Sequence, residues 1–159
     1  MDSFVKLFVK ASLTWFGIGA TLGVCMAIEP ALIIYRPAHL HMNLLGFVTM
    51  MIYGVAYHVM PRFTGHPLYS PRLAMAQWWL SNAGLATMVG GFAIAPRSAG
   101  IGGLLLAAGG ALSATGAYSF IFNIWRTLDG RPVPQSQDGP SGVITMRRGA
   151  RIPSTSKGA

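Results

Sequence analysis

Hydrophobic positions dominate four long stretches of the chain, and short polar segments separate them. Residues 11–28, 38–60, 73–95 and 98–125 contain no Lys, Arg, Asp or Glu. A bilayer core about 30 Å thick is spanned by roughly 20 apolar helical residues. Each stretch is long enough, the first by extending back through residue 4. The pattern predicts transmembrane helices at about 4–28, 38–60, 72–95 and 99–125.

The connections between these stretches are short and rich in proline. Prolines stand near every predicted boundary, at Pro30, Pro37, Pro61, Pro67, Pro71 and Pro96. Proline interrupts helices because it lacks a backbone N–H, and short connections make neighbouring helices antiparallel. We therefore expect an all-α, integral membrane four-helix bundle that forms one domain, residues 1–126.

The composition changes at residues 127–159, which are rich in Gly, Pro, Ser and Arg. Such a segment buries too little apolar surface to fold alone. We expect a disordered or extended cytoplasmic tail that is ordered only against a partner or the anionic leaflet of the membrane.

The net charge of +8 reports membrane topology and does not indicate nucleic acid as a partner. In the predicted arrangement ten cations fall on one side: Lys6, Lys10, Arg62, Arg72, Arg126, Arg131, Arg147, Arg148, Arg151 and Lys157. Only Arg36 and Arg97 fall on the other side. The positive-inside rule then predicts that both termini are cytoplasmic. We expect a multi-pass protein of a bacterial-type inner membrane.

Small residues recur every four positions on the first and fourth predicted helices. The rows are Gly19-Gly23-Ala27, Gly103-Ala107-Ala111-Thr115 and Gly109-Ser113-Ala117. In lipid, such rows let helix backbones approach closely. They indicate either packing within the bundle or an interface with another chain, and the pattern leaves both open.

Two of the four histidines, His39 and His41, lie at the predicted outer end of the second helix. A histidine inside a membrane is a candidate functional residue, because its polar ring needs a partner there. At about 100° per residue the two rings are about 200° apart around the helix, so they face nearly opposite directions. His58 lies about 25 Å away, at about 1.5 Å per residue, and cannot share an iron with His41. We expect His58 and His66 to be interfacial groups that need no cofactor.

The other predicted helices contain no histidine, so a haem held by His41 needs a different second ligand. Candidates at the same depth are Met26, Cys25 and Met88, the His41 of a second protomer, a partner subunit, or no ligand at all. A methionine ligand raises the reduction potential, whereas an open position permits gas binding. A single cysteine also excludes an intrachain disulfide.

The region 35–80 resembles part of a known family. The HxNLL run at 41–45, preceded by Arg36-Pro37 and followed by Gly54, Tyr57 and Pro61, resembles the second transmembrane helix of nitric oxide reductase large subunits and of haem–copper oxidases. The segments 65–67, 70–73 and 77–80 resemble the GxP, PRL and FWL elements that follow it in that family.

The resemblance implies a role for His41. In that family the histidine of HxN is an axial ligand of a low-spin haem b near the outer face, and His41 matches it because Asn43 follows two residues later. His39 has no such asparagine and is the second candidate. Arg36 and Arg97 are the expected partners of the haem propionates, since a guanidinium can bind a carboxylate through two hydrogen bonds.

The chain departs from the family in having four predicted helices and none of the histidines that hold the binuclear centre. By resemblance it retains half of a haem site, and a stand-alone oxidase or reductase is not expected. The leading hypothesis is a haem b protein that transfers electrons between quinol and an outer-face cytochrome, as a homo-oligomer or a subunit of a larger redox complex. The alternatives are a five-coordinate haem sensor or carrier of nitric oxide, and a haem-free structural subunit.

Overall fold

The computed structural model describes residues 3–130, and every regular element in that range is helical. The elements are α1 (Ser3–Ile28), the 3-10 helix η1 (Pro30–Tyr35), α2 (Arg36–His41), the π-helix η2 (Met42–Thr49), α3 (Met50–Thr64), α4 (Pro71–Ile94) and α5 (Ala99–Leu128). Because η1, α2, η2 and α3 follow one another without a break, they form a single helical rod. The predicted all-α fold of four long helical segments is confirmed.

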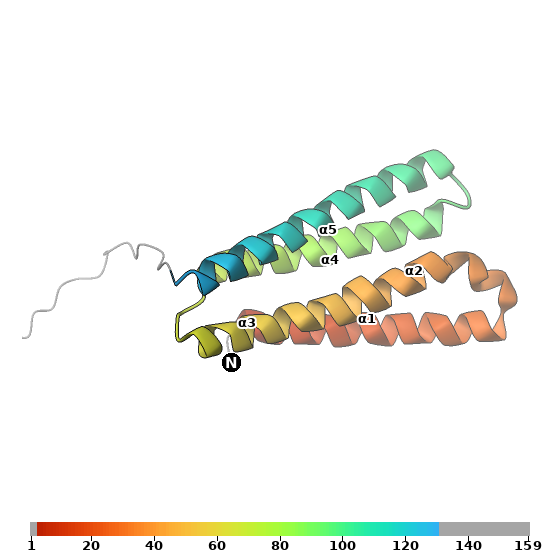
Figure 1. Cartoon of the computed structure of the whole chain (residues 1–159). Helices are drawn as coiled ribbons and strands as arrows, with labels where there is room; N and C mark the ends of the chain where they lie inside the picture. The colour runs from red at the N-terminus through yellow and green to blue at the C-terminus, as the bar shows by residue number, and fades with distance from the viewer. Residues whose placement is uncertain (1–2, 131–159) are drawn as a thin grey trace, which may run out of the picture.

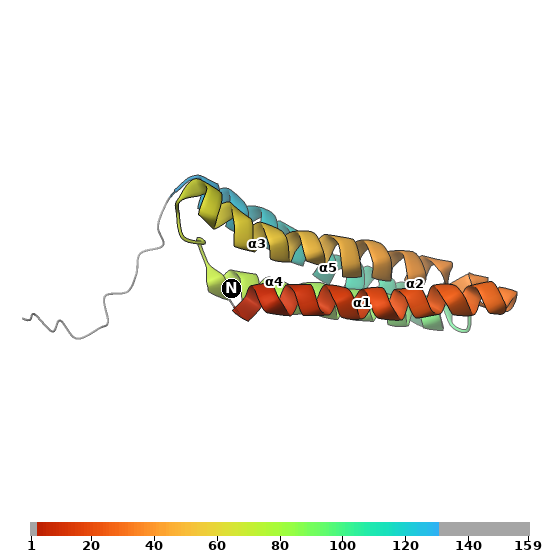
Figure 2. The ribbon, with the colours of Figure 1, turned by 90° about the horizontal axis from the view of Figure 1, so that it is seen from below.

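The four segments form two antiparallel hairpins that lie side by side (Figures 1 and 2). The first pairs α1 with the η1–α3 rod, and the second pairs α4 with α5. We call one end of the bundle the Ser3 end; it carries Ser3, Thr64, Pro71 and Leu128. The opposite end, with Ile28, Arg36, Ile94 and Ala99, is the Arg36 end.

The second helical segment is longer than the predicted 38–60 at both ends. It begins at Pro30, where the backbone N–H of Ala31 donates to the Glu29 carboxylate at 3.2 Å. It continues past Pro61 to Thr64 and ends at Gly65, whose φ of 71° is readily adopted by glycine. Pro37 and Pro61 therefore lie within this helical segment and do not end it, contrary to the prediction.

Three segments are long and apolar enough to cross a bilayer: Ser3–Ile28, Pro30–Thr64 and Ala99–Leu128. The fourth, α4, is 24 residues long but less apolar. Its sequence contains Gln77, Ser81 and Asn82, of which the first two are buried and the third accepts a hydrogen bond from the indole N–H of Trp15 at 3.0 Å. The polar groups of α4 thus face its helical neighbours.

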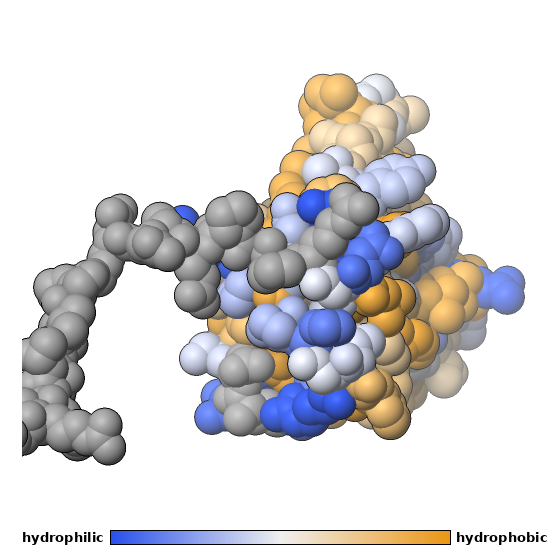
Figure 3. Space-filling model, turned by 60° about the vertical axis from the view of Figure 1, so that its left-hand side comes forward, coloured by the Kyte–Doolittle hydropathy of each residue, from blue (hydrophilic) through white to orange (hydrophobic). Residues whose placement is uncertain are grey.

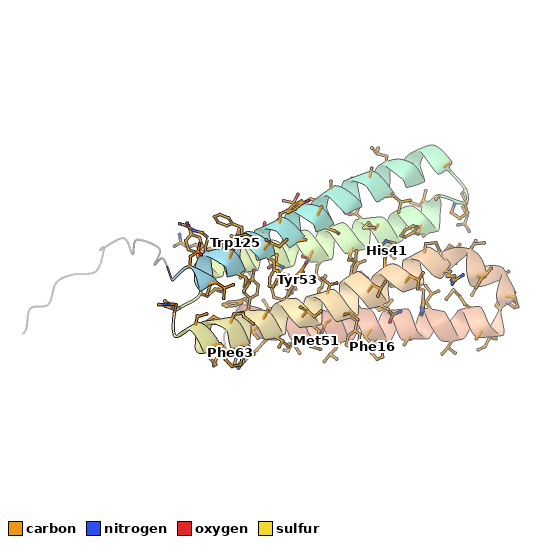
Figure 4. The ribbon with its side chains drawn as sticks, viewed as in Figure 1. Phe16, His41, Met51, Tyr53, Phe63 and Trp125 are labelled. Carbon is orange, nitrogen blue, oxygen red and sulfur yellow. The ribbon has the colours of Figure 1, made fainter. Side chains whose placement is uncertain are left out.

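The hydrophobic core is concentrated towards the Ser3 end. Phe8 of α1 packs edge-on against Tyr53 of α3, and Phe120 of α5 lies 4.4 Å from Tyr53 between ring centroids. Figure 4 shows Tyr53 in the interior, whereas Trp125 lies on the outer side of α5. These contacts join the two hairpins near one end.

Glycines allow the tightest helix contacts. A Cβ at Gly84 would lie 2.8 Å from the carbonyl oxygen of Gly109, so α4 and α5 touch backbone to backbone. Gly19 and Gly23 of α1 face the η1–α3 rod, where they make room for the side chains of Asn43 and His39. These two predicted rows pack inside the chain. The remaining row, Gly103-Ala107-Ala111-Thr115, is exposed along α5.

The division into a membrane domain 1–126 and a tail 127–159 stays a prediction. Helix α5 runs through this boundary to Leu128. Residues 131–159, which make up most of the predicted tail, lie outside the described range.

Candidate functional site

His41 is the last residue of α2 and is held by its own helix. Its Nδ1 lies 2.8 Å from the carbonyl oxygen of Pro37, one turn earlier. A carbonyl only accepts hydrogen bonds, so Nδ1 carries the proton and Nε2 keeps its lone pair in the neutral ring. Within residues 3–130 the structure gives Nε2 no hydrogen-bond partner. Metal-binding histidines commonly show this arrangement, in which one nitrogen is anchored and the other is available.

The His41 ring faces the second hairpin. It lies 5.0 Å from the ring of Phe92 on α4, measured between centroids. Figure 4 shows His41 on the side of the rod that faces α4, and the residue is half-buried. The available nitrogen therefore belongs to a ring that lies between the hairpins at the Arg36 end.

His39 lies on a different side of the rod and is fully engaged. Its Nδ1 is 2.9 Å from the carbonyl oxygen of Gly19 on α1, and the amide nitrogen of Asn43 is 3.4 Å from its Nε2. A Cβ at Gly23 would lie 2.9 Å from Cε1 of the same ring. The two histidines contact different helices, as their spacing predicts, and His39 is part of the packing between α1 and α2.

Asn43 has a different neighbour from the one that the HxN spacing suggests. Its amide donates to the His39 carbonyl at 2.9 Å and lies beside the His39 ring. Asn43 is four residues after His39, and positions four apart lie on the same face of a helix. The asparagine therefore supports His39, whereas Pro37, four residues before His41, supports His41. The same spacing in the sequence would have identified both partners.

A π-helix begins immediately after His41 and spans Met42–Thr49. At its end the hydroxyl of Thr49 donates to the carbonyl of Leu44, five residues earlier, at 2.8 Å. π-helical segments are rare and occur frequently at functional sites. No residue pattern in the sequence predicted this one.

Arg36 and Arg97 lie at the same end of the bundle as His41. Arg36 begins α2, and Arg97 lies in the turn between α4 and α5, where its guanidinium donates to the Ala93 carbonyl at 3.4 Å. Both side chains are exposed. The structure brings these two cations to one end, but it shows no hydrogen bond between either of them and His41.

The two candidate methionine ligands differ in environment. The sulfur of Met88 lies 3.9 Å from the Ser113 hydroxyl on α5, and its Cγ lies against Gly109. Met88 is thus directed towards α5. Met26 is half-buried near the end of α1, where the neighbouring Cys25 is exposed.

The remaining histidines lie at the Ser3 end. Nδ1 of His58 accepts a hydrogen bond from the guanidinium of Arg62 at 3.1 Å, and His66 is exposed in the loop after α3. Within residues 3–130 there is no group of three or more His, Cys, Asp or Glu side chains that could hold a metal ion.

The helical bundle, with three segments long and apolar enough to cross a bilayer within residues 3–130, is that of a multi-pass membrane protein. Residues 3–130 match the family described as Cytochrome C and Quinol oxidase polypeptide I, and the chain belongs to this family. The match confirms the resemblance found in region 35–80 and extends it over all four helical segments. A comparison with curated proteins gives no match.

Proposed function

We propose that this protein binds haem b through Nε2 of His41 and serves in electron transfer within the membrane. The observation that carries the proposal is the state of the His41 ring, whose Nδ1 is anchored on Pro37 while Nε2 has no partner in the described part of the chain. Family membership supports haem as the ligand. Haem, when bound, supplies a one-electron carrier whose potential depends on its axial ligands and its burial.

The other residues at the Arg36 end have defined tasks in this proposal. The hydrogen bond to Pro37 fixes the ring orientation of His41 and makes Nε2 the more basic nitrogen. Phe92 packs against the same ring and limits the access of water. Arg36 and Arg97 are the proposed partners of the propionates, because a guanidinium can bind a carboxylate through two hydrogen bonds.

The second axial ligand in this proposal comes from outside the chain. Phe92 occupies the α4 position beside His41, and the sulfur of Met88 is directed towards Ser113 on α5. The sources that this proposal favours over Met26, Cys25 and an open position are the His41 of a second copy and a partner subunit of a larger redox complex. A two-fold axis along the membrane normal would bring two copies of His41 to the same depth.

The charge distribution supports an orientation with the Ser3 end in the cytoplasm. Lys6, Arg62, Arg72 and Arg126 lie towards this end, and Arg36 and Arg97 lie towards the other. Quinol in the bilayer is the proposed electron donor, and an outer-face cytochrome is the proposed acceptor. The membrane is the inner membrane of a bacterial-type cell in this proposal.

The central test is haem content. The full chain is purified in detergent, and haem per chain is measured by the pyridine haemochrome method for wild type, His41→Ala and His66→Ala. We expect His41→Ala to lose haem completely, because it removes the axial ligand. His66→Ala is the matched control at the other end and should keep full content. A smaller loss in His39→Ala is expected, since that ring packs α1 against α2.

Retention of full haem content by His41→Ala would remove the proposal. A wild-type protein without haem would favour a structural subunit instead. Helix content by circular dichroism, measured on the same samples, shows whether a variant has lost haem because it has unfolded.

Spectra and stoichiometry test the second ligand. One haem per two chains with a bis-histidine spectrum is the result expected for a shared haem. One haem per chain with a methionine-to-iron charge-transfer band would overturn the external ligand and indicate Met26 or Met88. A spectral change on adding carbon monoxide would indicate an open position and a gas-binding function.

A further inference from the structure

A hollow of about 770 Å³ opens at the Ser3 end, at the opposite end of the bundle from His41. Its walls come from the start of α1, the end of α3, the loop 65–70 and the start of α4. The residues that define its chemistry are Phe4, Tyr57, Arg62, His66 and Leu68. Sites for small ligands in proteins have volumes of about 300–1,000 Å³, so the hollow is large enough for one.

The floor of the hollow is aromatic and apolar. The rings of Phe4 and Tyr57 meet edge to face, with centroids 5.8 Å apart and an interplanar angle of 90°. The Tyr57 hydroxyl donates to Oε1 of Gln77, a fully buried residue of α4. Because this hydroxyl is used inside the bundle, Tyr57 offers the hollow mainly its ring.

The rim of the hollow is cationic. Arg62 contributes a guanidinium that is held in place through two hydrogen bonds, to the carbonyl oxygen and to Nδ1 of His58. The imidazole of His66 lies against Gly130, where a Cβ would come within 2.8 Å of its Nε2. Arg72 directly follows the lining residue Pro71, and Lys6 lies two residues after the lining residue Phe4. Within residues 3–130, none of the residues that line the hollow is acidic.

Hydrogen bonds from α5 hold the loop wall in place before any ligand arrives. Asn123 accepts from the backbone N–H of Ser70 at 3.0 Å and donates to its carbonyl at 2.9 Å. The hydroxyl of Thr127 accepts from the N–H of Tyr69 at 3.0 Å. Asn123 and Thr127 are both buried. A preformed wall reduces the entropy that a ligand loses on binding.

Hydrophilic side chains gather at the Ser3 end, and hydrophobic ones cover the flanks behind it, as Figure 3 shows. Since α1 and the η1–α3 rod are apolar enough to span a bilayer, this end lies at a membrane–water boundary. A ligand that fits both parts of the hollow needs an anionic group for the rim and an apolar part for the floor.

We propose that this hollow binds the headgroup of an anionic phospholipid, with the phosphate at Arg62 and His66 and the glycerol and upper acyl chains over Phe4 and Tyr57. The argument is charge and polarity complementarity, because arginine binds phosphate through paired hydrogen bonds and the aromatic floor excludes a fully hydrated ion. Free inorganic phosphate shares the headgroup chemistry but would leave the floor unfilled.

Native mass spectrometry of the full detergent-purified chain tests this site. Palmitoyl-oleoyl phosphatidylglycerol and phosphatidylcholine with the same acyl chains are added separately to wild type, Arg62→Gln and Lys10→Gln. We expect wild type to retain one phosphatidylglycerol at least tenfold more strongly than phosphatidylcholine. Arg62→Gln should lose about tenfold of this retention. Lys10→Gln, which makes the same charge change at an exposed residue of α1 that does not line the hollow, should match wild type.

Equal retention of phosphatidylglycerol by wild type and Arg62→Gln would overturn the site, as would equal retention of the two lipids. Inorganic phosphate is the third probe. No displacement of the lipid at millimolar phosphate supports a lipid site, whereas phosphate binding that displaces the lipid would show that the hollow serves a free anion. The haem content of Arg62→Gln is measured in parallel and should equal that of wild type, so this proposal and the haem proposal can fail separately.

Discussion

Side chains from all four helical segments meet at the Ser3 end of the bundle, whereas at the Arg36 end the His41 ring of one hairpin packs against Phe92 of the other. The Ser3 end contains Tyr53, whose ring packs against both Phe8 and Phe120. It also contains the hydrogen-bonded chain from Asn123 through Tyr57 to Gln77. At the Arg36 end of the described chain, the buried apolar side chains are Ala38 and Met42. The aromatic core and Nε2 of His41, which has no hydrogen-bond partner in the described chain, thus lie at opposite ends of the bundle.

The two ends differ in how their polar groups are used. At the Ser3 end the Tyr57 hydroxyl donates to Gln77 inside the bundle, while the amide nitrogen of Gln77 has no partner within residues 3–130. At the Arg36 end Nδ1 of His41 is bonded to Pro37 of its own helix, and Nε2 has no hydrogen-bond partner in the described chain. The aromatic core therefore holds the Ser3 end together, and the candidate ligand nitrogen lies at the other end.

The largest effect on stability is expected from removing a core ring at the Ser3 end. Phe8→Ala should destabilise the bundle by about 3–5 kcal/mol, because it deletes a fully buried ring that packs on two tyrosines. Phe92→Ala, the same change on a half-buried residue at the Arg36 end, should cost clearly less. Unfolding in sodium dodecyl sulfate, followed by circular dichroism, measures both. Equal losses would show that the ends contribute equally.

A smaller effect is expected from the buried polar groups of the Ser3 end. Asn123→Ala leaves the N–H of Ser70 without its partner and removes one of the two hydrogen bonds that the Ser70 carbonyl accepts, the other coming from Ala74, and it should cost about 1–3 kcal/mol. Ser119→Ala, one turn earlier on α5, removes only a hydrogen bond to the Thr115 carbonyl on an exposed face and is the control. The same unfolding measurement applies. If Asn123→Ala behaves like Ser119→Ala, the loop is not held by α5.

The smallest effects are expected at two glycines of α1, Gly23 and Gly17. Their replacement by alanine should change the stability of the bundle in opposite directions. Gly23→Ala should destabilise, because its Cβ would come within 2.9 Å of the His39 ring. Gly17→Ala meets nothing within 4 Å and should stabilise by about 0.5–1 kcal/mol, since alanine favours helix over glycine. The unfolding midpoint of each variant, compared with that of wild type, measures the sign of each change. Two stabilising results would mean that His39 moves aside at little cost.

Much of the fold could be predicted from the sequence. Charge-free stretches, prolines and short connections predict four antiparallel helical segments, and the angular spacing of His39 and His41 predicts that they face different neighbours. The family resemblance, carried by region 35–80, is confirmed over residues 3–130. These features depend on local geometry, which a single sequence contains.

Other features depend on which helix lies beside which, and the sequence could not supply them. The helices are apolar on nearly all sides, so no amphipathic stripe indicates the inward face. The contact of Met88 with Ser113 and the chain joining Tyr57, Gln77 and Asn123 link residues far apart in sequence. That His41 is a haem ligand stays a prediction, and so does the identity of the second axial ligand.

The π-helix between the two ends affects any attempt to redesign the His41 site or to transfer it to another protein. A π-helical turn holds more residues than an α-helical turn, so the segment Met42–Thr49 acts as a shift in phase between the residues before it and those after it. A helical wheel drawn straight through 36–64 would assign wrong faces to one half. Transplanting the His41 face onto another scaffold therefore requires the whole segment to Thr49, because the angle between this face and Tyr57 is set there.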